Sequence, residues 1–134
     1  MKNYKYINNW DLVDASAYKI MGAYLFNKNK DKLFEFAHSK YLWKQRIAIV
    51  ATYYFIKQNK YDTTLEIAKI LLNHKHDLIQ KAVEWMIREI GNRNLQVETE
   101  FLKKYYKYMP KTMLRYAIEK FDSNTRKNYY NKLI

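Results

Sequence analysis

Cysteine is absent from the 134-residue sequence, and only two glycines and one proline are present. Without cysteine the chain can form neither disulfides nor a cysteine-based zinc site, and it suits a reducing compartment. Because an all-β fold needs glycine and proline at its many turns, their scarcity favours long helices. The sequence also lacks the run of about 20 apolar residues that a membrane span requires. Its polar residues 1–9 do not form a signal-peptide core. We therefore expect an all-α protein of the cytoplasm.

Positive charge is what the sequence has in excess. The 25 lysines and arginines exceed the 13 aspartates and glutamates, which gives a formal net charge of +12. A charge of this size favours a polyanionic partner, either nucleic acid or an anionic membrane. The alternative is a lysine-rich surface that keeps the protein soluble. Hydrophobic residues make up 49% of the chain, so it can bury a core, and its length fits one domain over residues 1–134.

Apolar residues recur at helical spacing almost throughout the chain. The pattern predicts helices over residues 9–26, 32–38, 41–58, 63–73, 77–91, 95–108, 111–121 and 123–133. Gly91 is expected to be the C′ residue that follows its helix, Pro110 to open the next-to-last helix, and Ser123 to be the N-cap of the last. Short polar breaks between the helices predict antiparallel helix pairs.

A weak repeat with a spacing of 35 residues supports this arrangement. Residues 46–48 align with residues 81–83, and these align with residues 116–118. Helical bundles also show such patterns by chance. If the repeat is real, the fold is a short α-solenoid with a concave face.

The predicted helix over residues 77–91 has a polar face that carries a tryptophan. Its apolar face consists of Ile79, Ala82, Val83, Met86, Ile87 and Ile90. Asp77, Lys81, Glu84, Trp85 and Arg88 fall on the opposite side. Either a neighbouring helix covers Trp85, or Trp85 lies in a cationic groove where Lys81 and Arg88 bind the phosphates of DNA.

The helix over residues 41–58 also has a narrow polar stripe, which contains Arg46, Tyr53 and Lys57. In the repeat register Arg46 takes the position of Lys81, so we expect both cations to line the same groove.

In the first predicted helix Trp10 and Asp14 are four residues apart and therefore neighbours on one face. Asp14 is interpretable as an acid favoured by the helix dipole or as a carboxylate reserved for a cationic reactant.

These segments resemble a known family. Residues 9–14, 42–48 and 80–89 resemble, in this order, three motifs of the DNA alkylation repair glycosylases, which are built from HEAT-like helical repeats. Residues 109–120 resemble the closing segment of that family. Order and spacing agree over nearly the whole chain. The resemblance implies an all-α fold, a HEAT-like α-α superhelix of antiparallel helix pairs.

The resemblance also implies an activity, the excision of positively charged N3- or N7-alkylated purines from double-stranded DNA. A charged purine leaves without a general acid, so the reaction needs a carboxylate that stabilises the oxocarbenium-like sugar. By position, Asp14 matches the family's catalytic carboxylate, and Trp10 and Trp85 match the indoles that flank the sugar. Arg46 and Arg88 match residues that contact the DNA backbone.

No metal or organic cofactor, no membrane and no obligate protein partner is implied by the resemblance. His74 and His76 form a His-x-His pair. A metal site needs at least three ligands, so this pair alone does not predict one.

Two features depart from the family pattern. Glu84 stands where the family has glycine, and its carboxylate would face the groove and repel phosphate. The first motif begins at residue 9, whereas the family fold begins well upstream, so we expect either the C-terminal part of a longer protein or a naturally shortened relative. Both departures favour a second hypothesis, a non-catalytic DNA-binding module. A protein-interaction scaffold is the third, because solenoids often have that role.

Overall fold

The computed structural model describes residues 30–132, and every regular element in this range is a helix. The elements are α3 (Asp31–Ala37), α4 (Leu42–Lys57), α5 (Asp62–Leu71), α6 (Asp77–Arg93), α7 (Leu95–Tyr105), η3 (Tyr106–Tyr108), α8 (Lys111–Ala117) and α9 (Ser123–Tyr130). The predicted all-α class is confirmed. The helix predicted over residues 9–26 lies outside the described residues. Within residues 30–132 no helix is long and apolar enough to cross a bilayer.

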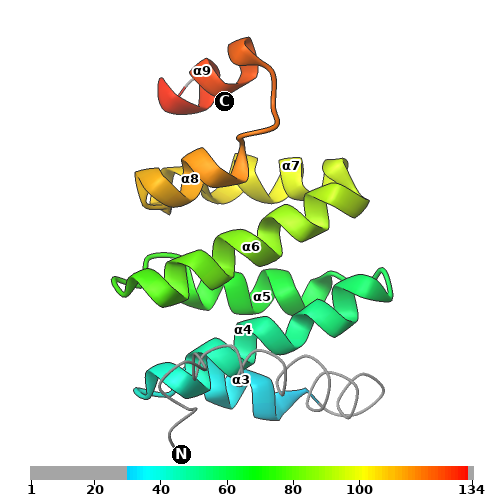
Figure 1. The fold of residues 1–134 in the computed structure, drawn as a ribbon, viewed down its shortest axis with the longest axis vertical. Coiled ribbons are helices and arrows are strands. Elements are labelled where there is room, and N and C mark those ends of the chain that lie inside the picture. The colour runs from blue at the N-terminus through cyan, green and yellow to red at the C-terminus, as the bar shows by residue number, and fades with distance from the viewer. Residues whose placement is uncertain (1–29, 133–134) are drawn as a thin grey trace, which may run out of the picture.

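The helices stack along the long axis of the molecule (Figure 1). α3 packs on α4 and α5 packs on α6, each pair joined by a short loop, while α3 also contacts α5. α4 packs against α6, and α6 against α8, so these three helices form a row. Stacked helix pairs of this kind make a short α-solenoid, which is the predicted architecture.

α6 is the central helix of the stack, because it contacts α4, α5, α7 and α8. The six residues of its predicted apolar face are all buried: Ile79, Ala82, Val83, Met86, Ile87 and Ile90. Burying a large aliphatic side chain contributes about 1.5–3 kcal/mol to folding. The apolar stripe of α6 is therefore a main source of cohesion between neighbouring helix pairs.

The 35-residue repeat is visible in the hydrogen bonds of the loops. α4 begins at Leu42 and α6 begins 35 residues later at Asp77. Gln45 Nε2 donates to the carbonyl oxygen of Ser39 at 2.7 Å, and Gln80 Nε2 donates to that of His74 at 2.8 Å. In both cases the acceptor lies six residues before the glutamine. The two loops are therefore held to their helices in the same way.

The prediction that Gly91 follows the end of its helix is wrong. α6 continues through Gly91 to Arg93, and no glycine among residues 30–132 has a positive φ. The helix stops at Asn94, whose extended backbone starts α7 and whose Oδ1 accepts from Val97 N at 3.3 Å. Gly91 has a different role, since a Cβ at this position would stand 2.1 Å from Oε1 of Glu98. Its small size lets the Glu98 carboxyl lie against α6.

The N-cap of the last helix also differs from the prediction. Asp122 rather than Ser123 caps α9, because its Oδ1 accepts from the backbone N–H of Thr125 at 2.7 Å. A capping side chain must precede the N–H that it binds by two or three residues, and Asp122 satisfies this spacing. Pro110 precedes α8 as predicted, but α8 ends at Ala117, earlier than the predicted residue 121.

Candidate nucleic-acid interface

The predicted DNA-binding residues of the described part lie on two helices of one row. Arg46 is the fifth residue of α4, and Lys81 is the fifth residue of α6. Trp85 and Arg88 follow Lys81 one and two turns along α6. Since α4 packs against α6, the structure places Arg46 and Lys81 at matching positions on adjacent helices. Trp10 and Asp14 lie outside the described residues.

Trp85 is half-buried, and α4 supplies part of its cover. The centroid of its ring is 5.4 Å from that of Tyr53, with 50° between the ring planes. A neighbouring helix thus does cover Trp85 in part, as one of the two interpretations expected. Trp85 as a whole remains partly accessible to solvent.

Arg46 links α4 to the first turn of α6. Its Nη1 donates a hydrogen bond to the carbonyl oxygen of Leu78, and the side chain is half-buried. This contact holds a positive charge between the two helices, near the N-terminus of α6.

Lys81 lies at the surface with 63% of its side chain exposed. Its Nζ is 3.0 Å from Oδ2 of Asp77, one turn earlier on α6, and Asp77 is itself largely exposed. Exposed ion pairs of this kind contribute about 0–1 kcal/mol, so an incoming phosphate can displace the carboxylate at little cost.

Arg88 has partners that its position in the sequence motif does not predict. Its Nη1 is 2.8 Å from Oε2 of Glu119, and the guanidinium lies 4.6 Å from the ring centroid of Tyr116. Only 21% of its side chain is exposed. Arg88 therefore joins α6 to α8 and the turn after it. The repeat register could have revealed these partners, because Tyr116 takes the position of Lys81, and Glu119 lies 35 residues after Glu84.

Glu84 is half-buried beside Trp85. Burial raises its pKa to about 7, and the charge of Asp77 adds to this while Lys81 opposes it. Glu84 therefore carries only part of a negative charge near neutral pH. The repulsion of phosphate expected from its position is weakened accordingly.

The two histidines of the loop before α6 serve as hydrogen-bonding groups of the backbone and of α4. His76 Nδ1 accepts from Leu78 N at 3.2 Å and caps α6, and His74 Nδ1 accepts from His76 N at 3.0 Å. With Nδ1 accepting, Nε2 of His74 carries the proton and donates to Gln45 Oε1 at 2.8 Å. Burial, with the charge of His76, lowers the pKa of His74. Among residues 30–132 no three His, Cys, Asp or Glu side chains cluster where they could hold a metal ion.

Comparison with models of protein families identifies a family for this chain. The model of a family described as DNA alkylation repair enzyme matches residues 1–121. The match spans α3 to α8 and the residues before them, so it includes both helices of the candidate interface as well as Trp10 and Asp14. No curated protein matches the chain.

Proposed function

Because this chain belongs to the DNA alkylation repair enzyme family, we propose that it is a DNA glycosylase that excises N3- or N7-alkylated purines from duplex DNA. The observation that carries the proposal is the family match over residues 1–121, which includes the Trp10, Asp14 and Trp85 motif positions. The cationic positions on α4 and α6 support it.

In this proposal Asp14 is the catalytic carboxylate. An alkylated purine is cationic and leaves without protonation, so the barrier is the positive charge that develops on the sugar. A fixed carboxylate facing the sugar stabilises that charge and orients the attacking water. Trp10 and Trp85 are proposed to flank the sugar.

The DNA backbone is proposed to bind to the row formed by α4 and α6. Arg46 and Lys81 offer positive charge at matching positions, and their spacing along the row follows the helix repeat. Arg88 would bind phosphate by exchanging the Glu119 carboxylate, which is its present anionic partner. Phosphate contacts fix the position of a protein on the duplex without reading its sequence.

The test is release of free base by the purified chain. Duplex DNA treated with a methylating agent is incubated with excess protein, and 7-methylguanine and 3-methyladenine are measured over time. We expect both bases to appear faster than by spontaneous loss, and unmodified purines to remain in the DNA. Release at the spontaneous rate by a folded, DNA-binding protein would contradict glycosylase activity.

A second candidate function is a DNA-binding module without turnover. It is favoured by Glu84, which departs from the family pattern directly before Trp85, one of the residues proposed to flank the sugar. The same assay separates the two functions, since this candidate binds duplex DNA but releases no base.

A further inference from the structure

The end of the helix stack carries a second basic surface, distinct from the predicted DNA-binding residues. It is formed by η3, α8 and α9, where α9 follows α8 at the end of the stack (Figure 1). The family model matches residues 1–121, so α9 lies outside the match. We call this region the α8–α9 surface and define it by the cations that line its two hollows: Lys107, Lys111, Arg115, Arg126, Lys127 and Lys132.

The first hollow has a volume of about 380 Å³ and is lined by α8, α9 and the turn between them. Three positive charges come from Arg115, Arg126 and Lys127. Ser123 and Tyr130 add hydroxyl groups, and the six lining residues, all within residues 30–132, include no aliphatic side chain. Arginine, lysine, serine and tyrosine are among the side chains that bind phosphate oxygens of nucleic acids, whereas the core of a protein interface is depleted of charge. The lining therefore favours a phosphate over an apolar side chain.

A second hollow of about 360 Å³ adjoins the first, because Arg115 and Tyr130 line both. Its further cations are Lys107, Lys111 and Lys132. The side chain at the shared edge is accessible, since Tyr130 is 48% exposed. Cations spread over two neighbouring hollows suit a linear polyanion better than a single small anion.

The cations of the first hollow keep their charge available. Arg115 and Lys127 are exposed and have no ion-pair partner in the described part of the chain. Arg126 Nη1 donates to the backbone carbonyl oxygen of Glu119 at 3.3 Å. This hydrogen bond holds the guanidinium beside the turn after α8 and leaves its positive charge uncompensated.

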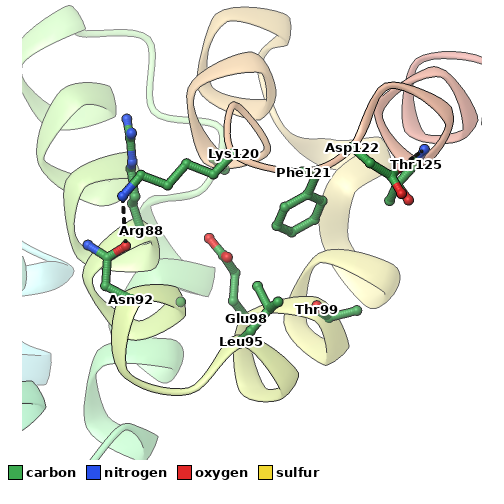
Figure 2. A pocket seen from close by; sticks show the side chains of 11 residues that line it. Arg88, Asn92, Leu95, Glu98, Thr99, Lys120, Phe121, Asp122 and Thr125 are labelled. Atoms are coloured by element: carbon green, nitrogen blue, oxygen red, sulfur yellow. Dashed lines mark hydrogen bonds between the residues drawn. The ribbon is translucent and has the colours of Figure 1, made fainter.

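Two acids lie close to these cations in the sequence, and both are bound elsewhere. Glu119 lines the first hollow, but its Oε2 is 2.8 Å from Nη1 of Arg88. Asp122 lines a different pocket, beside α6 and α7, and its Oδ1 accepts from Thr125 N (Figure 2). Because Arg88 belongs to the candidate interface on α6, its pair with Glu119 also shows that the α8–α9 surface adjoins that interface.

We propose that the α8–α9 surface binds phosphates of the DNA backbone, in addition to the contacts of the α4–α6 row. It extends the contact with DNA beyond the residues that the family model matches. The inference rests on the proposed function only for its partner, duplex DNA, and it requires neither base excision nor Asp14. The alternative partner of such a surface is an acidic protein.

The experiment measures the affinity of the full chain for a labelled, unmodified duplex by fluorescence anisotropy at several salt concentrations. Arg115→Ala and Lys127→Ala should each reduce the slope of log affinity against log salt by about one, and the double variant by about two. Arg115→Lys keeps the charge and should retain the wild-type slope. Lys103→Ala, which removes an exposed lysine of α7, is the matched control and should also retain it. Melting temperatures verify that each variant folds.

Comparison with Lys81→Ala separates this proposal from the proposed function. Unchanged slopes in Arg115→Ala and Lys127→Ala, together with a reduced slope in Lys81→Ala, would overturn the α8–α9 contact and leave the α4–α6 row standing. Reduced slopes in the α8–α9 variants alone would support this surface and contradict the row. A chain that binds duplex DNA without releasing any base would contradict glycosylase activity and leave the α8–α9 contact intact.

Labelled poly-glutamate tests the alternative partner. At equal salt concentration it should bind more weakly than a duplex of the same total charge. Tighter binding of poly-glutamate than of the duplex, lost in both Arg115→Ala and Lys127→Ala, would assign the surface to acidic proteins and overturn the proposal.

Discussion

Glu98 places a carboxyl group where water hardly reaches it, and this has a consequence for stability. Its folded pKa is raised to about 8 from an ordinary value of 4.5. As the pH rises above about 4.5 the unfolded chain loses this proton first, so the contribution of Glu98 is complete below that pH and is lost by about pH 8. Wild type should therefore lose on the order of 3 kcal/mol of its free energy of unfolding between pH 5 and pH 8 because of Glu98. Glu98→Gln cannot ionise at this position and should not show this loss.

Urea unfolding at about pH 5 and pH 8 measures this difference. Glu100→Gln serves as the control, because the exposed Glu100 of the same helix should leave the pH dependence as it is in wild type. Identical pH dependence in wild type and Glu98→Gln would show that Glu98 is ionised in the folded protein.

Asp14 gives the second prediction at the scale of a residue, and it tests the proposed chemistry. Asp14→Asn is nearly isosteric and removes the charge that would face the oxocarbenium ion. Excision should fall a hundredfold or more, which corresponds to on the order of 3 kcal/mol. DNA binding should be unchanged or tighter, because the carboxylate repels phosphate in the ground state.

Single-turnover release of 7-methylguanine and the melting temperature are measured together. An Asp14 that only favours the helix dipole would lose less than about 1 kcal/mol of stability and leave the rate unaltered. That outcome would remove Asp14 from the active site.

At the scale of an element, the end of α6 depends on a contact between Gly91 and Glu98. Gly91→Ala places a methyl group where Oε1 of Glu98 now lies, so it should destabilise the protein by about 1–3 kcal/mol. In a Glu98→Ala background the obstruction is gone, and the better helix propensity of alanine should stabilise by up to about 1 kcal/mol. Chemical unfolding of the four proteins completes the cycle. Equal effects of Gly91→Ala in both backgrounds would contradict the contact.

The cap of α9 is a further test at this scale. Asp122→Ala removes the acceptor for Thr125 N and should lower the melting temperature by a few degrees, whereas Ser123→Ala should have almost no effect. The hydrogen bonds from Thr125 lower the pKa of Asp122. The difference between the variants should therefore persist above about pH 4 and vanish as the pH falls below the pKa of the folded carboxyl. A larger effect of Ser123→Ala would restore the sequence-based assignment of the cap.

What the sequence could predict at this scale was the existence of the helices and their buried faces. The apolar stripe of α6 follows from periodicity alone, and all of its residues are buried. Helix ends were harder, because adjacent residues such as Asp122 and Ser123 both favour the N-cap and only the backbone decides between them. Gly91 was misassigned since its reason is a side chain on another helix. The pairing of Arg88 with Glu119 likewise depends on how α8 packs on α6, which local pattern does not contain.

At the scale of the whole molecule, the positive charge is only lightly compensated. Several acids of the described part pair with lysines on their own helices, as in Lys32–Glu35, Lys69–Glu66 and Lys81–Asp77. Such largely exposed pairs are weak and are screened by salt. The net charge of +12 therefore attracts a polyanion. Which positive residues contact that polyanion is open to measurement.

The salt dependence of DNA binding answers this question. Each phosphate contact releases condensed counterions, so the logarithm of the affinity for duplex DNA should fall linearly with the logarithm of the salt concentration. Lys81→Ala should reduce the slope by about one, because Lys81 lies on the α4–α6 row and its ion pair with Asp77 is easily exchanged. Lys103→Ala, which removes an exposed lysine of α7, should leave the slope unchanged. Arg88→Ala should have a smaller effect than Lys81→Ala, since Glu119 already neutralises Arg88 and must be released first.

Fluorescence anisotropy of a labelled duplex, titrated at several salt concentrations, gives the slopes. Equal effects of Lys81→Ala and Lys103→Ala would mean that the charge acts as a diffuse whole, and an affinity independent of salt would refute phosphate binding by this surface.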